Sequence, residues 1–386
     1  MNIKRLNILL MLLLLVMIII CSSIVVNNVI PVTTFGEEYS SAKAMSVIEA
    51  NSGRELLSKN SDKELAMAST TKIMTALVAI ENTPDLDKVV NIDKRAIGIE
   101  GTSIYLTDKE NLTMRELLYG LMLASGNDAS VAIASEVTNG DIDLFIEMMN
   151  KKAQEIGANH THFANTHGLD AKNHYTSAHD LAVITSCAIK NPVFKEIVST
   201  KRTTIAGNDK VEKRYLKNKE KLLNTYEGCI GVKTGFTDNA GRCNVTAVEK
   251  DNMLVICVVL NCPDMFEESA RLLDEVFEKY TNEIVLPIGY IQTQVTVNGG
   301  KCEKVNVFNK KEFNYPLTNI EKSLIIIESD LPDELEAPIE KDSAIGTIVV
   351  KLNDQIIFSD SIYTMDSVEK QIIRTEIEDI IDNWAY

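Results

Sequence analysis

Apolar residues follow helical spacing in some parts of this chain and strand spacing in others. Helical spacing predicts a helix opening at Ser69, one after the capping box at Thr113–Glu116, and an amphipathic helix that ends at Gly157. Two further helices are predicted at LAVITSCAI and ESARLLDEVFEKY. Strand patterns predict two strands within residues 44–59, joined by the turn at Asn51-Ser52-Gly53, and three consecutive strands at CIGVKTGFT, GRCNVTAVE and MLVICVVL.

The pattern changes near residue 283, after which β-rich segments dominate. With 386 residues the chain exceeds what one core usually holds, so two domains are expected. We predict an α+β fold, in which a helix-flanked antiparallel sheet at 37–282 is followed by a small β-rich domain at 283–366. The tail at 367–386 has apolar residues at helical spacing and predicts an amphipathic helix. Its polar face is mostly acidic, so binding to a membrane surface and packing on the protein both stay open.

The N-terminus predicts export. Lys4 and Arg5 precede an apolar run from Ile8 to about Val26, and small residues flank a cleavage point after Gly36. Residues 1–36 are therefore a predicted signal peptide, although the apolar run is long enough to serve as an uncleaved anchor. Either form places the remaining chain at the outer face of the cytoplasmic membrane or in the cell envelope.

Charge and cysteine content narrow the classes of partner. The formal net charge of −16 argues against a nucleic-acid partner, which normally needs a basic surface. Seven cysteines are present, of which six follow the predicted cleavage point. Cys257 lies in the apolar run MLVICVVL, where a thiol behaves as a small hydrophobic group. Structural thiols with at most one disulfide are the expectation.

Three short motifs carry candidate chemistry: Ser69-x-x-Lys72, Ser125-x-Asn127 and Lys233-Thr234-Gly235. The first opens a helix, the second lies between two helices, and the third ends a strand. Serine needs an adjacent base to act as a nucleophile, and positions i and i+3 share one helix face. Burial and the second cation at Lys233 would lower the pKa of Lys72 enough for a neutral amine to act as that base.

The order and context of these motifs resemble those of the low-molecular-mass penicillin-binding proteins of the D-alanyl-D-alanine carboxypeptidase type. The resemblance rests on five segments, which are ASTTKIMTAL, LMLASGNDA, NTHGLD, HYTSAHDLA and GVKTGFTDNAGRC. It covers roughly residues 40–280. It implies the penicillin-binding/β-lactamase type of sheet, a peptidoglycan stem peptide as substrate, and β-lactam antibiotics as covalent inhibitors. No cofactor and no metal are expected.

The resemblance also implies roles for individual residues. Ser69 would be the acylated nucleophile, Lys72 its general base, and Ser125 the group that passes a proton to the leaving D-alanine. Asn127 would hydrogen-bond the peptide substrate, and Lys233 and Thr234 would bind its terminal carboxylate. Gly235 would let the substrate approach the strand edge. The backbone N–H groups of Ser69 and Phe236 would form the oxyanion hole.

Several alternatives compete with this interpretation. The loop between Gly157 and Asp180 contains no glutamate to speed deacylation, which disfavours a β-lactamase. A D,D-transpeptidase or endopeptidase would use the same acyl-enzyme, and a non-catalytic peptidoglycan-binding protein would keep the fold alone. Five histidines at 160–179 suggest zinc but lack a known ligand spacing. A triad of a serine with His167 and Asp170 would leave Lys72 unexplained.

Overall fold

A computed structural model describes residues 40–371 except 109 and 209. In it the chain forms two compact units. One unit comprises described residues up to Glu283 together with Asn314–Asn319, and the other comprises Ile284–Phe313 and the described residues from Ile320 onward. The predicted signal segment at 1–36 lies outside the described residues. Within the described part, no helix combines the length and the apolar character that a membrane crossing requires.

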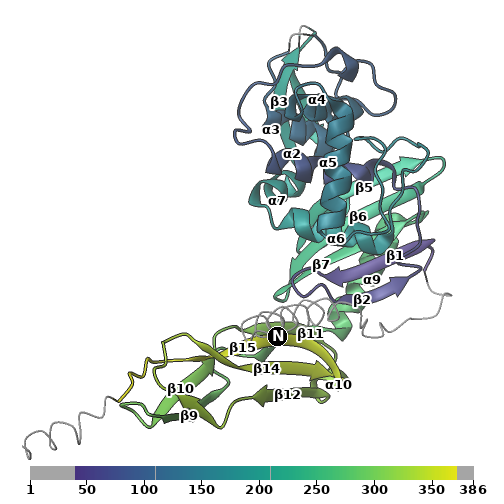
Figure 1. The fold of residues 1–386 in the computed structure, drawn as a ribbon. Coiled ribbons are helices and arrows are strands. Elements are labelled where there is room, and N and C mark those ends of the chain that lie inside the picture. Colours follow the sequence, from purple (N-terminus) through teal and green to yellow (C-terminus); the bar gives the residue numbers. More distant parts are fainter. Residues whose placement is uncertain (1–39, 109, 209, 372–386) are drawn as a thin grey trace, which may run out of the picture. The chain divides into compact units, whose positions relative to one another are not determined.

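A five-stranded antiparallel sheet organises the first unit (Figure 1). Its strands lie in the order β2-β1-β7-β6-β5, so the strands predicted within residues 44–59 and the three consecutive later strands are confirmed as one sheet. The bounds are β1 (Ala44–Glu49), β2 (Glu55–Lys59), β5 (Cys229–Thr237), β6 (Gly241–Lys250) and β7 (Met253–Leu260).

The central strand β7 explains why both faces of this sheet are covered. Its side chains alternate between two cores, because successive residues of a strand point to opposite faces. Ile256, Val258 and Leu260 pack with the main group of helices. Val255 and Cys257 pack instead with residues of α9 (Met265–Lys279) on the opposite face. The continuous apolar run MLVICVVL is therefore the signature of a strand buried on both sides.

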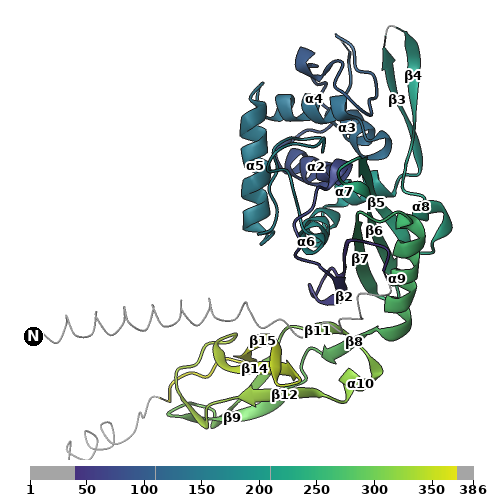
Figure 2. The ribbon, with the colours of Figure 1, turned by 90° about the vertical axis from the view of Figure 1, so that its right-hand side faces the viewer.

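The remaining helices of this unit lie on the face opposite α9 or beside it (Figures 1 and 2). Their bounds are α2 (Lys72–Glu81), α3 (Met114–Tyr119), α4 (Asn127–Val137), α5 (Ile142–Glu155), α6 (Ala178–Ile189), α7 (Pro192–Ser199) and α8 (Leu222–Thr225). The capping box predicted at Thr113 and Glu116 is present at the start of α3. A 3-10 turn, Ala68–Thr71, precedes α2, so Ser69 lies in that turn.

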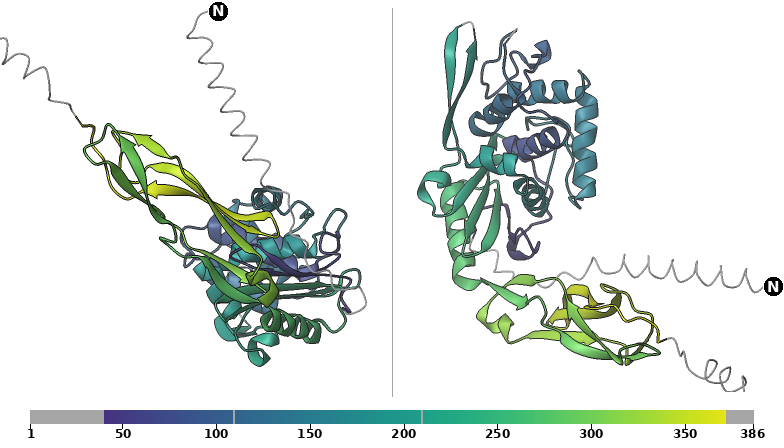
Figure 3. Two further views of the ribbon diagram at one scale, coloured as in Figure 1. Left: turned by 90° about the horizontal axis from the view of Figure 1, so that it is seen from below. Right: turned by 90° about the vertical axis from the view of Figure 1, so that its left-hand side faces the viewer.

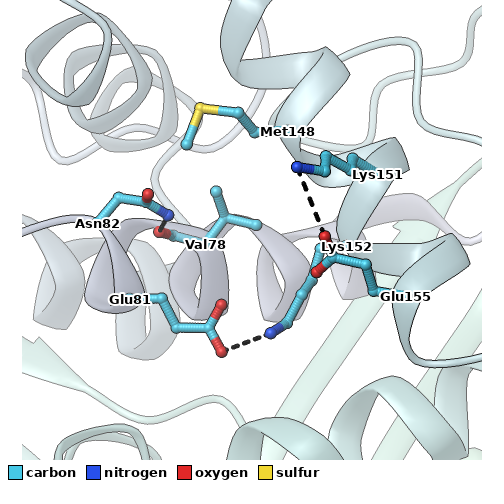
Figure 4. Close-up of a pocket in the computed structure, with 7 residues that line it drawn as sticks. All are labelled: Val78, Glu81, Asn82, Met148, Lys151, Lys152 and Glu155. Atoms are coloured by element: carbon cyan, nitrogen blue, oxygen red, sulfur yellow. Dashed lines mark hydrogen bonds and ion pairs between the residues drawn. The ribbon is translucent and has the colours of Figure 1, made fainter.

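The long helix α5 packs across α2, and a cleft of about 290 Å³ lies between them (Figure 4). The Lys152 ammonium, on α5, pairs with the Glu81 carboxylate at the end of α2 over 2.7 Å. Lys151 and Glu155 form a second ion pair along α5. None of the predicted site residues lines this cleft.

The hairpin of β3 (Arg202–Asn208) and β4 (Val211–Lys217) was not predicted (Figures 2 and 3). Its sequence is rich in lysine, arginine and threonine. Among its described side chains, only Ile205 and Leu216 are apolar and buried. The alternation that marks a half-buried strand is therefore too weak to read from the sequence.

The second unit is built on a six-stranded sheet in the order β12-β14-β15-β10-β9-β13, which confirms its β-rich character (Figure 3). Its core includes Val295, Val307, Ile348 and Ile362. The bounds are β9 (Gln292–Asn298), β10 (Lys304–Asn309), β12 (Ile325–Asp330), β13 (Glu334–Glu336), β14 (Ala344–Leu352) and β15 (Gln355–Thr364), with α10 at Asn319–Lys322. A separate two-stranded sheet pairs β8 (Thr281–Leu286) with β11 (Phe313–Leu317).

The amphipathic helix predicted at 367–386 does not begin at residue 367. Val368 pairs with Ile339 and Lys370 pairs with Gly300, so the chain is extended there. The Val368 side chain is 3% exposed and belongs to the core of the second unit, and a β-branched residue is well suited to an extended segment. Residues 372–386 lie outside the described part of the chain.

Candidate active site

Ser69 lies in a tight turn immediately before α2. The Thr70 hydroxyl donates to the Met67 carbonyl over 2.6 Å, and the Thr71 hydroxyl donates to the Ala68 carbonyl over 2.8 Å. These two bonds hold the turn, in which Ala68 has a left-handed φ of 49°. Such a backbone is costly for alanine and is found mainly where the surrounding structure enforces it. The turn fixes the Ser69 backbone and starts α2 at Lys72.

The Lys72 side chain is fully buried and reaches Ser69. Its Nζ lies 2.9 Å from Ser69 Oγ, 2.7 Å from Asn127 Oδ1 and 2.6 Å from the His167 carbonyl oxygen. An ammonium would donate one N–H to each of these oxygens. A neutral amine would donate to Asn127 and His167 and would keep its lone pair for Ser69, because neither of those two oxygens carries a proton to share.

The environment favours the neutral amine. Burial lowers the pKa of Lys72 well below its usual value, and the charges of Lys233 and Lys219 lower it further, while Asp128 opposes them. The cause predicted from the sequence, burial next to a second cation, is therefore present. The Ser69 hydroxyl then faces a nitrogen that can accept its proton over 2.9 Å.

The segment with Ser125 and Asn127 lies between two helices. A π-helical turn, Gly120–Ala124, follows α3 and ends at Ser125, whose φ of 67° is left-handed. Turns of this kind are often found at functional sites. Ser125 is 4% exposed, and α4 begins two residues later at Asn127.

Both ends of the Asn127 amide are engaged within the protein. Its Oδ1 accepts from Lys72, and its Nδ2 donates to the Glu100 carbonyl over 2.6 Å. The loop that carries Glu100 lies so close that a Cβ at Gly101 would come within 2.8 Å of Nδ2. Asn127 therefore holds Lys72 in position in this structure, and the substrate contact predicted for it stays a prediction.

Strand β5 brings the third motif beside Ser69. A Cβ at Gly235 would lie 2.9 Å from the Ser69 backbone nitrogen and 3.1 Å from the Met67 carbonyl oxygen, so only glycine allows this approach. Gly235 thus serves the contact between two protein segments, a use that the sequence did not reveal. The Phe236 side chain that follows is 62% exposed.

Lys233 is 1% exposed, and its Nζ donates to the Thr234 carbonyl over 2.8 Å. Burial and, next, the Lys219 ammonium lower the pKa of Lys233 to about 7, against the Glu220 carboxylate, which raises it. Thr234 is half-buried at the same strand edge. The structure therefore places a buried lysine, a hydroxyl and the Ser69 turn beside the middle of β5. The prediction that this motif ends a strand is wrong, because the pairing with β6 continues to Thr237.

The NTHGLD segment also contributes to the site. Asn165 Oδ1 accepts from the backbone N–H groups of His167 and Gly168, which confirms a loop fixed by Asn165 and Gly168. That fixed loop presents the His167 carbonyl to Lys72. The His167 ring nitrogen Nδ1 accepts a hydrogen bond from the Leu169 N–H. The Asp170 carboxylate accepts hydrogen bonds from the Thr237 and Asn239 side chains. His167 and Asp170 therefore do not form the triad considered above.

The other histidines have structural partners. His174 Nδ1 accepts from the Ala164 N–H, so the ring proton lies on Nε2, which donates to the Thr71 hydroxyl over 2.8 Å. This bond supports the turn that carries Ser69. Among the described residues no group of histidine, cysteine, aspartate or glutamate side chains could hold a metal ion. All six cysteines from Cys187 onward are free thiols.

Three comparisons with known proteins show what this chain is similar to. The chain matches the family described as D-alanyl-D-alanine carboxypeptidase over residues 32–264, and the one described as penicillin-binding protein 5, C-terminal domain, over residues 280–370. It is 32% identical over 360 residues to the D-alanyl-D-alanine carboxypeptidase DacF of Bacillus subtilis, an alignment that covers 89% of this chain and 90% of that protein.

Two solved structures extend the comparison to the fold. Penicillin binding protein 5 of Haemophilus influenzae is 28% identical, with a TM-score of 0.73 over 87% of this chain and 100% of the other. The Streptomyces K15 DD-transpeptidase is 31% identical, with a TM-score of 0.59 over 63% of this chain and 100% of the other.

Proposed function

This chain belongs to the D-alanyl-D-alanine carboxypeptidase family of serine hydrolases, and we propose that it removes the terminal D-alanine from peptidoglycan stem pentapeptides. One observation carries the assignment of the site. The buried Lys72 amine lies 2.9 Å from Ser69 Oγ, and Asn127 Oδ1 and the His167 carbonyl oxygen hold the amine in that position. A serine beside a base of lowered pKa is the arrangement that acyl transfer requires.

The reaction would proceed through an ester of Ser69. Lys72 Nζ takes the Oγ proton while Oγ forms a bond to the carbonyl carbon of the penultimate D-alanine. As the tetrahedral intermediate collapses, the C–N bond breaks, and Ser125 passes a proton to the leaving nitrogen. Water then attacks the ester and releases the shortened peptide. The backbone N–H groups of Ser69 and Phe236 would stabilise the negative oxygen in both steps.

Lys233 and Thr234 would select the substrate by its terminal carboxylate. A buried cation attracts an anion strongly because little water competes with it. The Thr234 hydroxyl would add a hydrogen bond, and Gly235 allows β5 to lie close to the Ser69 turn. Asn127 would hold Lys72 in position and would also hydrogen-bond the peptide substrate.

β-Lactams would acylate the same serine, and the resulting acyl-enzyme would be hydrolysed slowly. The loop between Gly157 and Asp180 contains no glutamate to activate a deacylating water. The acyl-enzyme should therefore persist, so that penicillin acts as an inhibitor. This separates the proposed carboxypeptidase from a β-lactamase on the same fold.

The family acts on cell-wall peptidoglycan, so this protein works in the cell envelope. We propose export through residues 1–36, with catalysis at the outer face of the cytoplasmic membrane. Residues 37–282 would form the catalytic domain and residues 283–366 a β-rich domain. We also propose attachment to the membrane, through either an uncleaved N-terminus or the C-terminal tail. Fractionation of cells would test this attachment.

The decisive experiment is the intact mass of the purified protein after incubation with benzylpenicillin, with Ser69→Ala in parallel. We expect a stable one-to-one adduct that Ser69→Ala lacks while keeping its folded circular dichroism spectrum. A second assay measures D-alanine released from a synthetic peptide ending in D-Ala-D-Ala, with a peptide ending in L-Ala as control.

Each outcome distinguishes one alternative. An adduct on Ser69→Ala would overturn the assignment of the nucleophile. Rapid penicillin turnover without an adduct would indicate a β-lactamase. Neither adduct nor turnover would leave a non-catalytic binding protein. An adduct without D-alanine release, together with peptide transfer to an added amine acceptor, would indicate a transpeptidase.

A further inference from the structure

The β3–β4 hairpin and its flanks carry a concentration of positive charge that the mechanism above does not use. Residues 201–221 contain eight lysines and arginines and three acidic residues, in a chain whose formal net charge is −16. Such a local excess attracts an anionic partner that the remaining surface of an acidic protein repels. An anionic ligand would therefore approach the protein at this hairpin.

The cations gather on one face of the hairpin. Residues directly opposite each other in an antiparallel pair point to the same side, and every second residue along a strand shares that side. Three such pairs are Arg202 with Lys217, Thr204 with Tyr215, and Ala206 with Lys213. This outer face consequently presents the exposed cations Arg202, Lys213 and Lys217 together with the Tyr215 ring, which is 83% exposed.

The other face of the hairpin packs toward the helices of the first unit (Figure 2). Arg214 is buried there, and its guanidinium donates to the carbonyls of Ile104 and Tyr105. In the same loop, the Thr102 carbonyl accepts from the Asn127 N–H over 2.7 Å. The hairpin is therefore fastened to a loop that contacts the candidate active site.

The charges of the outer face are not neutralised by the described part of the protein. No described carboxylate forms an ion pair with Arg202, Lys213 or Lys217. Glu212 precedes Lys213 on the same strand, so its side chain points to the opposite side. Arg202 and Lys217 are like charges directly opposite each other, an arrangement that destabilises a strand pair. A bound anion would remove that repulsion.

A hollow of about 410 Å³ on the hairpin suits a glycan that carries carboxylates. It is lined by Arg202, Thr203, Thr204, Tyr215, Leu216 and Lys217. The two cations can bind carboxylates, and the threonine hydroxyls can hydrogen-bond sugar hydroxyls. The Tyr215 ring offers an apolar surface on which a sugar ring can pack. A polymer of phosphate groups would use the cations alone.

We propose that this outer face binds the peptidoglycan strand, a glycan carrying anionic peptides, while one of its stem peptides occupies the Ser69 site. The inference rests on the proposed function and deepens it, because the strand is the polymer from which the terminal D-alanine is removed. Each uncleaved stem peptide ends in a carboxylate, so a strand repeats the charge that Arg202 and Lys217 attract. The hairpin holds the polymer, and the chemistry stays with Ser69 and Lys72.

The test compares a polymeric substrate with a small one. Peptidoglycan that retains pentapeptides and carries no phosphate polymer is used to measure binding of the Ser69→Ala protein by pelleting. Release of D-alanine by the active protein is measured from the same material and from a synthetic peptide ending in D-Ala-D-Ala. For Arg202→Gln combined with Lys217→Gln we expect roughly a fivefold loss of binding and of release from peptidoglycan at low salt. Release from the synthetic peptide should be unchanged.

Lys94→Gln combined with Lys190→Gln is the matched control. It removes two exposed cations from the same unit, both outside the hairpin. Its binding and release should equal those of the protein with an unaltered hairpin. Added salt should reduce the difference between the two double variants, because salt screens exposed charges. Tyr215→Ala changes no charge and should lower peptidoglycan binding about threefold at every salt concentration.

Several outcomes would overturn the inference while leaving the proposed function intact. They are unchanged peptidoglycan binding in the hairpin double variant, equal losses in the two double variants, and an equal loss with the synthetic peptide. Binding only to peptidoglycan that still carries a phosphate polymer would also overturn it, by identifying that polymer as the partner.

The formation of a benzylpenicillin adduct by each variant in the active protein serves as the check of folding. If the hairpin double variant forms no adduct, Tyr215→Ala decides, because unchanged peptidoglycan binding there would overturn the inference. Failure of the unaltered protein to form an adduct, or to release D-alanine from the synthetic peptide, would instead contradict the proposed function.

Discussion

At the scale of single residues, Gly168 supports the turn that carries Ser69. Its φ is +95°, and a Cβ there would lie 1.9 Å from the Ala68 carbonyl oxygen and 2.9 Å from the Ser69 nitrogen. No rotation of a side chain relieves a clash between Cβ and backbone. Gly168→Ala should therefore displace the Ser69 turn, lower the free energy of unfolding by roughly 3 kcal/mol, and slow acylation at least tenfold.

Gly157→Ala is the control for this prediction. Gly157 also has a positive φ, +82°, but a Cβ there would meet no atom within 4 Å. It should cost only the backbone strain of about 1 kcal/mol and leave acylation unchanged. Urea denaturation and penicillin acylation rates measure both effects. Equal losses in the two variants would show that backbone strain, and not contact with the Ser69 turn, explains Gly168.

The residues of the site differ in how far the sequence could predict them. Ser69 and Lys72 were readable because helical spacing alone places i and i+3 together. The His167 carbonyl was not readable, because any residue type offers a carbonyl and only the fold of the loop aims it at Lys72. Glu220 was missed for a related reason. Glu220 is buried, and the charged segment KNKEK gives no sign of that burial.

At the scale of elements, one buried ion pair fastens the β3–β4 hairpin. The Arg214 guanidinium pairs with the Glu110 carboxylate over 2.7 Å and also donates to the carbonyls of Ile104, Tyr105 and Ala206. Removing one member of a buried pair leaves an uncompensated charge. Arg214→Met should therefore cost about 3–5 kcal/mol of stability and speed hydrogen exchange in both strands of the hairpin.

A double variant tests whether the ion pair causes this loss. Arg214→Met with Glu110→Gln removes both charges, so most of the lost stability should return. Hydrogen exchange of residues 202–217 followed by mass spectrometry is the readout, with strand β7 as an internal reference. A double variant no more stable than Arg214→Met would mean that the guanidinium's bonds to the carbonyls, and not its charge, hold the hairpin.

Whether a helix or strand could be predicted depended on how clear its apolar spacing is in the sequence. Strand β7 and helix α5 were predicted because a buried strand and an amphipathic helix leave clear apolar spacing. The β3–β4 hairpin and the π-helical turn before Ser125 were not, because the first is mostly polar and the second differs from an α-helix only in its hydrogen bonds. The extended segment at Val368 escaped prediction because its apolar residues also fit helical spacing.

At the scale of the whole molecule, each unit has its own core. Ile133, in α4, is fully buried in the core of the first unit, and Ile348, in β14, is fully buried in the core of the second. Units with separate cores commonly unfold separately. We therefore expect two calorimetric transitions in the full chain. Replacing either isoleucine by alanine should cost about 2–5 kcal/mol and lower one transition by several degrees.

Labelling by a fluorescent penicillin identifies which transition belongs to the catalytic unit. All the predicted site residues lie between Ser69 and Phe236, within the first unit. Loss of labelling on heating should therefore follow the transition that Ile133→Ala lowers and should be unaffected by Ile348→Ala. A single transition shifted by both variants would contradict separate unfolding. Labelling that falls early in Ile348→Ala would instead mean that the second unit is needed to keep the Ser69 site folded.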